Sequence, residues 1–270
     1  MSFILHRADT VFEAIELQKE TGGKYIAAGT VLLVNLYRGK EHAEHLISLE
    51  GISQLYGINL EEDRLIIGAQ TTLTEIERSE EVRRYANCLW QAACQVGGPQ
   101  IRNRATIGGN IASAMPSADC ITPLLALDAT VLIHGKHIYR IPLRELYLGM
   151  LQTVLEPWEV IVAVEIPLTE ISAFAKVGKR NALSVSCLNM AVVKKQGFRV
   201  AVGSASPIPV LCTKTSAILS EGELTEVRLE KACRMILTEI APIDDRWATA
   251  TYRKKVCVNE LKALIKEVQR

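Results

Sequence analysis

The sequence predicts an α+β protein in two parts, and three features of the chain carry this prediction. Helical and strand patterns alternate up to a run rich in Val and Ile over residues 158–166, which a proline closes. Two strand patterns then meet at Gln196-Gly197, a hairpin signal. Helical spacing follows over residues 226–240 and 252–268. Strands followed by helices are typical of an α+β unit, so we place a boundary near residues 167–171.

Start and stop signals define the first elements. Thr10-Val11-Phe12-Glu13 has the pattern of a capping box, and Gly22-Gly23 ends the helix that it opens. An apolar strand over residues 25–28 runs into a loop at Gly29-Thr30, and a helix over residues 31–37 begins there. Further strand patterns lie at residues 46–49 and 64–69.

Helical patterns dominate the next stretch. Thr72-Leu73-Thr74-Glu75 repeats the capping box, and a longer helix is predicted over residues 81–96 until Gly97-Gly98-Pro99 ends it. Residues 100–119 are predicted as a long loop. The remaining patterns are a short helix at 123–127, a strand at 129–134 and the hairpin strands at 188–194 and 198–204.

Composition excludes several classes of protein. The 270 residues suffice for one or two domains, and a hydrophobic content of 49% is typical of a soluble globular protein. The 31 basic and 30 acidic residues are well mixed, so no basic stripe indicates nucleic acid. No apolar run approaches the roughly twenty residues of a membrane span, and no secretory signal is visible. We therefore expect a cytoplasmic protein without a membrane partner.

The metal-ligating residue types form no recognisable site. The seven cysteines are scattered and contain no CxxC pair, which argues against a disulfide framework, a zinc site or an iron–sulfur cluster held by this chain alone. We expect most of them to be small buried residues. Among the five histidines, His42 and His45 alternate with Glu41 and Glu44, a pattern typical of a solvated surface.

Two glycine-containing segments are the candidate ligand-binding loops. Thr106-Ile107-Gly108-Gly109-Asn110 lies in a stretch dense in small and polar residues, and Asp119 follows it in Pro116-Ser117-Ala118-Asp119. The earlier segment is Tyr25-Ile26-Ala27-Ala28-Gly29-Thr30-Val31-Leu32-Leu33. Glycine lets the backbone approach a ligand that a Cβ would exclude. Backbone N–H groups and a nearby carboxylate suit a diphosphate with ribityl or ribose hydroxyls.

Each of these features also has an ordinary structural explanation. Ala27 to Thr30 can be a plain strand-to-helix turn, and Asp119 can be a helix N-cap. Arg102 and Arg104 can pair with phosphate, remain solvated or contact a partner subunit. Cys120, beside Asp119, can be a thiol next to a bound cofactor, but we expect a packed core residue. Neither segment has the GxGxxG or P-loop spacing, so neither of those nucleotide motifs applies.

Three stretches carry a resemblance to a known family, and four later landmarks extend it over essentially the whole chain. The three stretches are Ala27-Ala28-Gly29-Thr30, Gly98-Pro99-Gln100-Ile101-Arg102-Asn103-Arg104-Ala105-Thr106-Ile107-Gly108-Gly109-Asn110-Ile111-Ala112, and Pro116-Ser117-Ala118-Asp119 with Leu124-Leu125-Ala126-Leu127-Asp128-Ala129. The landmarks are Glu159-Val160-Ile161-Val162, Lys176-Val177-Gly178-Lys179-Arg180, Ala205-Ser206-Pro207-Ile208-Pro209 and Tyr252-Arg253. The sequence resembles the FAD-binding subunit of the molybdenum hydroxylases, which include bacterial xanthine dehydrogenase and carbon monoxide dehydrogenase (medium subunit).

The resemblance implies a fold and a domain division. A vanillyl-alcohol-oxidase-like (PCMH-type) FAD-binding region is expected over residues 1–168, in lobes of about 1–57 and 58–168. An α+β domain of the CO dehydrogenase flavoprotein type is expected over residues 169–270. The whole protein is then of the α+β class.

The resemblance also implies a set of FAD-binding residues. These are Tyr25, Ile26, Ala27, Ala28, Gly29, Thr30, Val31, Leu32, Ala105, Thr106, Ile107, Gly108, Gly109, Asn110, Ser113, Asp119, Ile161 and Lys176. Both glycine segments are expected to hold the diphosphate, Ser113 and Asp119 to contact the ribityl and diphosphate portion, and Ile161 to pack near the adenine or flavin. Lys176 is expected near the flavin ring, where its charge would raise the flavin potential.

Three positions depart from the family pattern. The family usually has a second glycine where Ala28 stands and a polar residue where Val31 stands, and an aspartate is common at Ser184. Ala28 adds a methyl group close to the expected diphosphate, and Val31 removes a hydrogen-bonding group. These changes bear on FAD affinity more than on the fold.

The implied activity is electron transfer within a complex. A large subunit with a molybdopterin cofactor hydroxylates a substrate such as a purine or aromatic heterocycle, and a small subunit carries two [2Fe–2S] clusters. FAD on this chain delivers electrons to NAD⁺ or another acceptor, and no catalytic residue for hydroxylation is expected here. A cofactor-free assembly or scaffold subunit is the alternative. A stand-alone flavoprotein oxidase is disfavoured, because no substrate domain of adequate size remains.

Overall fold

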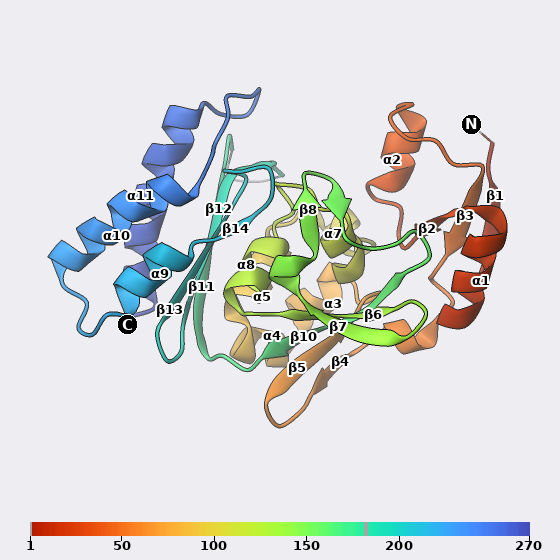
Figure 1. The fold of residues 1–270 in the computed structure, drawn as a ribbon, viewed down its shortest axis with the longest axis horizontal. Helices are drawn as coiled ribbons and strands as arrows, with labels where there is room; N and C mark the ends of the chain where they lie inside the picture. The colour runs from red at the N-terminus through yellow and green to blue at the C-terminus, as the bar shows by residue number, and fades with distance from the viewer. Residues whose placement is uncertain (1, 181–182) are drawn as a thin grey trace.

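The computed structural model describes residues 2–180 and 183–270, and it confirms the predicted α+β class (Figure 1). A small parallel sheet with two helices opens the chain. Its elements are β1 (Ile4–Arg7), α1 (Val11–Thr21), β2 (Lys24–Ile26), α2 (Leu32–Tyr37) and β3 (His45–Ser48), in the strand order β1-β3-β2. Helix α1 begins where predicted, because the Thr10 side chain accepts the N–H of Glu13, and it ends at Gly22 with φ of 63°.

An antiparallel five-stranded sheet occupies the middle of the molecule. It contains β4 (Ile58–Leu60), β5 (Arg64–Gly68), β10 (Val160–Pro167), β6 (Thr130–His134) and β7 (Ile138–Pro142), side by side in that order. Short helices fill the chain between β5 and β6: α3 (Leu73–Arg78), α4 (Glu80–Tyr85), α5 (Asn87–Cys94), α6 (Pro99–Arg102), α7 (Ile107–Ala112) and α8 (Ile121–Ala126). A small hairpin of β8 (Tyr147–Gly149) and β9 (Gln152–Thr153) precedes β10.

The single helix predicted over residues 81–96 is wrong, because the chain breaks at Ala86 into α4 and α5. Ala86 has φ of −146° and ψ of 48°, outside the helical region. It forms an isolated parallel bridge with Thr169, whose N–H donates to the Tyr85 carbonyl at 3.0 Å. A contact with a segment more than eighty residues away therefore outweighs the local helical pattern.

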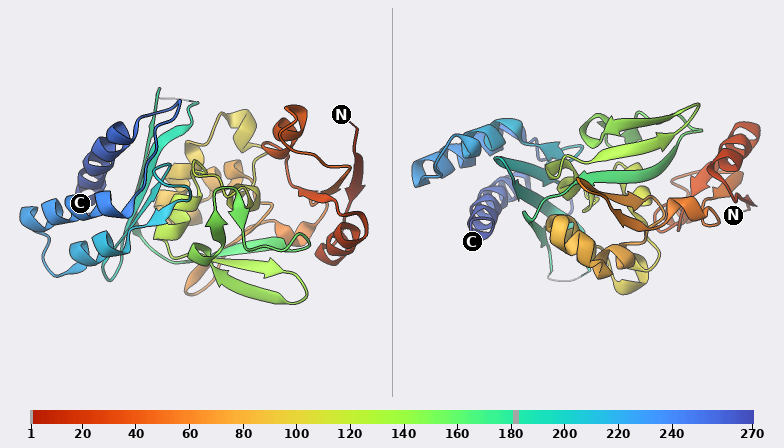
Figure 2. Two further views of the ribbon diagram at one scale, coloured as in Figure 1. Left: turned by 45° about the horizontal axis from the view of Figure 1, so that its top comes forward. Right: turned by 90° about the horizontal axis from the view of Figure 1, so that it is seen from below.

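The C-terminal part is an antiparallel sheet covered by three helices. Its elements are β11 (Ile171–Gly178), β12 (Ser186–Lys194), β13 (Phe198–Gly203), β14 (Val210–Leu211), α9 (Thr213–Ser220), α10 (Glu226–Glu239) and α11 (Ala250–Glu267). The predicted hairpin and both long helices are confirmed. All views in Figures 1 and 2 place α9–α11 at the end of the molecule opposite the N-terminal sheet.

The C-terminal sheet is buried on both faces. Along β12, Met190 and Val192 pack in one core with α9–α11, whereas Ala191 and Val193 pack in the core of the five-stranded sheet. Side chains alternate across a strand, so one strand supplies both cores. Helices α5 and α8 cover the second face (Figure 1). The core of the five-stranded sheet thus continues into the C-terminal part without a solvent layer.

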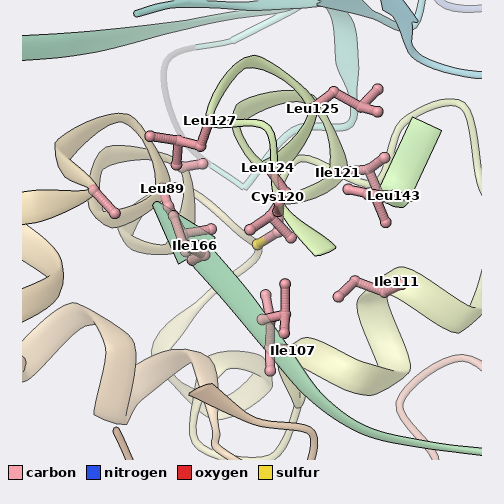
Figure 3. Close-up of a cluster of buried hydrophobic side chains, with 14 of the residues drawn as sticks. Leu89, Ile107, Ile111, Cys120, Ile121, Leu124, Leu125, Leu127, Leu143 and Ile166 are labelled. Carbon is pink, nitrogen blue, oxygen red and sulfur yellow. The ribbon is translucent and has the colours of Figure 1, made fainter. Parts of the chain in front are cut away.

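Among the described residues, no helix is long and apolar enough to cross a membrane. Six of the seven cysteines are buried and Cys94 is half-buried, as expected for small core residues. Cys120 packs beside Ile107, Ile121 and Ile166 in the core shown in Figure 3. Burial and the charge of Asp119 raise the pKa of the Cys120 thiol, so it is neutral at physiological pH.

Candidate functional site

A cavity of about 470 Å³ lies between the segment after β2 and helix α7. It brings together both glycine segments that the sequence singles out. The predicted residues that line it are Tyr25, Ile26, Ala27, Ala28, Gly29, Thr30, Val31, Leu32, Ala105, Thr106, Gly109, Asn110, Ser113 and Asp119. Its volume lies in the range of small-molecule and cofactor sites.

Other wall residues were not predicted. They are Lys24, Asn35, Glu41, Val96, Ile101, Ala112, Met115, Ser117, Ala118 and Leu151. Lys24 and Glu41 form an ion pair with each other. Val96, Ile101 and Met115 give one part of the wall an apolar character. Apolar residues of this kind look like ordinary core positions in a sequence, so no local pattern marks them as part of a site.

The first segment depends on Gly29. Its φ is +71°, in the left-handed region, and a Cβ there would lie 2.6 Å from Cδ1 of Leu33. Ala28 is not among the residues with positive φ, so its methyl group imposes no backbone strain. The departure from glycine at position 28 therefore leaves the conformation of this segment intact.

The same segment presents a row of free backbone donors. Within residues 2–180 and 183–270, the N–H groups of Ala28 to Leu32 donate to no protein acceptor. Val31 is the N-cap of α2, and it supplies no capping side chain. A polar residue at this position would satisfy one of those N–H groups itself. Successive N–H groups at a helix start favour an anion, so this segment can bind a phosphate or diphosphate.

The second segment is the first turn of α7, so the prediction of an irregular loop over residues 100–119 is wrong. Ile107 N–H donates to the Thr71 carbonyl at 3.0 Å, and Gly109 N–H donates to Oγ1 of Thr106 at 3.1 Å. Gly108 N–H donates to the Ala69 carbonyl at 2.8 Å. These N–H groups are used inside the protein, and the free donors lie on the first segment instead.

The two adjacent glycines have different roles. A Cβ on Gly108 would lie 2.7 Å from Cβ of Ala69, so this glycine lets α7 pack directly against the end of β5. Gly109 faces the cavity, where a side chain would fill space. Ile107 does not line the cavity, because it points into the core beside Ile111 (Figure 3).

One polar atom in the cavity wall has no partner. Oδ1 of Asn110 is buried and accepts no hydrogen bond from the described residues. Such an orphaned acceptor has a free-energy cost of about 1–3 kcal/mol unless a ligand donates to it. Ser113 also lines the wall, and its hydroxyl donates to the Asn110 carbonyl at 2.7 Å. A ligand with a hydroxyl or N–H donor would satisfy Asn110.

Asp119 and Lys176 form a buried ion pair at the edge of the cavity. Nζ of Lys176 lies 2.7 Å from Oδ2 of Asp119, and their side chains are 9% and 6% exposed. Oδ1 of Asp119 accepts hydrogen bonds from Ser186 and Asn189. Both carboxylate oxygens are therefore engaged by the protein. Lys176 does not line the cavity itself, but its ammonium is fixed to a residue that does.

Neither candidate arginine projects freely into the large cavity. Arg102 donates from two nitrogens to the carboxylate of Glu77, at 2.8 and 3.2 Å. Arg104 lies 3.5 Å from a carboxylate oxygen of Glu50. The structure thus pairs both arginines with carboxylates of this chain, an arrangement that the sequence analysis did not predict.

A smaller cavity of about 170 Å³ adjoins the first one. The two share Ala27, Ala28 and Thr106, so they meet at the first glycine segment. Its other wall residues are Glu50, Tyr56, Gln70, Thr72, Asn103 and Arg104. Ile161, the remaining predicted residue, lies buried in β10 and lines neither cavity.

Comparisons with known proteins give a consistent result. Residues 1–169 match the family of the FAD binding domain in molybdopterin dehydrogenase, and residues 173–268 match that of the CO dehydrogenase flavoprotein C-terminal domain. The xanthine dehydrogenase FAD-binding subunit of Escherichia coli O157:H7 is 31% identical, over 97% of this chain and 94% of that protein. The carbon monoxide dehydrogenase medium chain of Hydrogenophaga pseudoflava is 28% identical, over 93% of this chain and 91% of that protein.

The fold agrees with these matches. A solved structure of carbon monoxide dehydrogenase from Hydrogenophaga pseudoflava, which lacks the Mo-pyranopterin moiety of the molybdenum cofactor, superposes with a TM-score of 0.95. The two sequences are 27% identical, and the superposition covers 100% of this chain and 98% of the other.

Proposed function

The chain belongs to the FAD-binding subunits of the molybdenum hydroxylases, and from this premise we propose that it passes electrons from iron–sulfur clusters of a partner subunit through FAD to NAD⁺ or another acceptor. The row of free N–H groups from Ala28 to Leu32 is the observation that carries the proposal. It offers a binding site for the diphosphate of a dinucleotide.

The residues present fit FAD. The diphosphate needs anion donors, and the segment from Ala28 to Leu32 supplies backbone N–H groups at the start of α2. A ribityl or ribose hydroxyl would satisfy the orphaned Oδ1 of Asn110. The apolar wall at Val96, Ile101 and Met115 suits an aromatic ring system. Ala28 and Val31, the departures from the family pattern, leave the donors free, so they do not argue against binding.

The chain's own groups would bind, orient and tune the cofactor. When bound, FAD supplies two-electron redox chemistry. Gly29 fixes the backbone curvature that aims the donors, and Gly109 leaves space beside α7. Within residues 2–180 and 183–270, the Lys176 ammonium uses two of its three donors, on Asp119 and on the Gln95 carbonyl at 2.8 Å. We propose that the third faces the flavin.

The partners, the substrate class, the location and the domain division are also proposed from membership of this family. The partners are a molybdopterin-binding large subunit and a small subunit with two [2Fe–2S] clusters. The similarity to the Escherichia coli xanthine dehydrogenase subunit over nearly the whole chain favours a purine or aromatic heterocycle as the substrate of the complex. We place the complex in the cytoplasm, residues 1–168 in the FAD-binding region and residues 169–270 in the C-terminal domain.

Purification of the co-expressed complex tests this function. We expect the complex to contain FAD, and the flavin absorbance to bleach when a hydroxylatable heterocycle such as xanthine is added without an acceptor. NAD⁺ should then restore the absorbance, or an artificial acceptor should do so if NAD⁺ is not the natural one. A complex that assembles fully but contains no flavin would instead support the scaffold alternative.

A further inference from the structure

The ion pair at the edge of the cavity is connected to a chain of buried polar groups that the proposed function does not use. Asn189 on β12 donates from Nδ2 to Oδ1 of Asp119 at 2.8 Å. Thr122 on α8 donates from its hydroxyl to Oδ1 of Asn189 at 2.6 Å. Ser186, also on β12, donates to the same carboxylate oxygen as Asn189. With Lys176 on β11, Asp119 thus receives donors from two strands of the C-terminal sheet.

Thr122 supports the orientation of the Asn189 amide in which the NH₂ group faces Asp119. An amide has an acceptor oxygen at one end and an NH₂ donor at the other. Because the Asp119 carboxylate only accepts, the NH₂ group faces it, and the Thr122 hydroxyl donates to the amide oxygen at the other end. A reversed amide would place its oxygen against a negative charge. Both Thr122 and Asn189 are fully buried, so water does not replace either bond.

The neighbouring strand leaves room for this pair. A Cβ on Gly203 of β13 would lie 2.2 Å from Oδ1 of Asn189 and 2.3 Å from Oγ1 of Thr122. Only glycine at position 203 accommodates the two polar atoms where they lie. Strand β13 therefore packs beside the hydrogen bond between Thr122 and Asn189 only because residue 203 has no side chain.

We propose that Asn189, supported by Thr122, is a positioning residue of the flavin site, which acts on bound FAD through Asp119 and Lys176. Neither Asn189 nor Thr122 lines the cavity, whereas Asp119 does. The inference rests on the proposed function, since it assigns the network an effect on the cofactor. An apolar residue of similar volume in place of Asn189 would leave Oδ1 of Asp119 with one donor, Ser186, instead of two.

Two nearly isosteric variants test the proposal, Asn189→Leu and Thr122→Val. The matched control is Ser216→Ala, which removes a buried hydroxyl of the C-terminal domain that accepts from Val200 N–H and donates to the Cys212 carbonyl. The first readout is the rate at which an acylating reagent labels Lys176 in the FAD-free full chain, followed by mass spectrometry. The second is the midpoint potential of the FAD-loaded chain.

We expect both test variants to label Lys176 severalfold faster than the wild type, because Asp119 holds the ammonium less closely. The potential should move to more positive values, in the same direction as in Asp119→Asn, because less of the Lys176 charge is compensated. Ser216→Ala should change neither readout. Wild-type or slower labelling of Lys176 and an unchanged or lower potential in both test variants, or equal changes in the control, would overturn the proposal.

The labelling experiment needs no cofactor, so the two hypotheses can fail separately. If the wild-type chain binds no FAD, the proposed function is wrong, and with it any role of Asn189 toward a flavin. If FAD binds normally but Asn189→Leu changes neither the labelling rate of Lys176 nor the midpoint potential, only the positioning role is wrong.

Discussion

Lys176 and Asp119 carry opposite charges 2.7 Å apart, so their removal should shift a bound flavin in opposite directions. Lys176→Met leaves a buried carboxylate near the cofactor and should lower the midpoint potential. Asp119→Asn leaves the ammonium uncompensated and should raise it. A shift of ~30 mV corresponds to about 1.4 kcal/mol for a two-electron couple, a size typical of one such charge interaction. Spectroelectrochemical titration of the two FAD-loaded variants measures both shifts.

The opposite signs expected for Lys176→Met and Asp119→Asn can be contradicted directly. Shifts of the same sign in both variants, or none in either, would show that the pair does not act on the flavin as a charge. Lys176→Met also unpairs a buried charge, a change that is strongly destabilising by about 3–5 kcal/mol. The potential is therefore compared only in preparations that retain the wild-type circular dichroism spectrum.

Gly29 offers a second test at the scale of one residue. Gly29→Ala places a Cβ at φ of +71° and against Leu33, so the backbone that carries the free N–H groups should shift. We expect the FAD dissociation constant to rise about tenfold, which is about 1.4 kcal/mol. Gly39→Ala is the matched control, because Gly39 has φ of +66° but open space where a Cβ would stand. FAD titration of both variants separates site geometry from general backbone strain.

Both glycine variants should lose about 1–2 kcal/mol of unfolding free energy from the left-handed backbone, and Gly29→Ala should lose more because its Cβ also overlaps Leu33. Equal FAD affinity in Gly29→Ala and the wild type would mean that the segment from Ala28 to Leu32 does not hold the diphosphate.

At the scale of elements, helix α7 links the cavity to the core. Thr106 caps it by accepting the Gly109 N–H, and Thr225 caps α10 in the same way by accepting the Arg228 N–H at 3.3 Å. Replacing either threonine by alanine should cost about 1 kcal/mol of unfolding free energy, measured by chemical denaturation. Only Thr106→Ala should also weaken FAD binding, because α10 lies far from the cavity.

If Thr106→Ala loses stability but keeps wild-type FAD affinity, then the start of α7 is not part of the binding site. A loss of affinity in Thr225→Ala as well would point to general loosening of the fold.

The sequence predicted helix starts and a hairpin correctly where a capping residue or a turn marks them. The caps at Thr10 and Thr72 placed two helix starts, and the hairpin at Gln196-Gly197 was found from its turn. The break at Ala86 was missed because it depends on Thr169, far along the chain. Helix α7 was missed because a paired glycine weakens any local helical signal, and its packing on Ala69 is a tertiary contact.

In the candidate site, too, the sequence predicted the local features and missed those that depend on contacts between distant segments. The sequence identified both glycine segments, and the cavity does bring them together. It did not reveal which segment has free N–H groups, because hydrogen bonds to Thr71 and Ala69 occupy those of α7. Nor did it connect Asp119 with Asn189, which lies seventy positions away on β12 of the C-terminal sheet. Spacing along the chain carries no information on such partners.

At the scale of the whole molecule, the shared core predicts cooperative unfolding. The β12 residues Ala191 and Val193 pack with the five-stranded sheet, while Met190 and Val192 pack with α9–α11. Separating the C-terminal part would expose one full face of its sheet. We therefore expect one calorimetric transition for the full chain, with equal calorimetric and van't Hoff enthalpies. Two resolved transitions would show that the parts fold independently.

The central claim is that the segment from Ala28 to Leu32 binds the diphosphate of FAD. Titration of the purified FAD-free chain with FAD and, in parallel, with riboflavin tests it most directly, because riboflavin has the same ring system but no phosphate. We predict saturable binding of one FAD per chain, and affinity for riboflavin weaker by at least about tenfold, or about 1.4 kcal/mol. No FAD binding, or equal affinity for the two ligands, would contradict the claim.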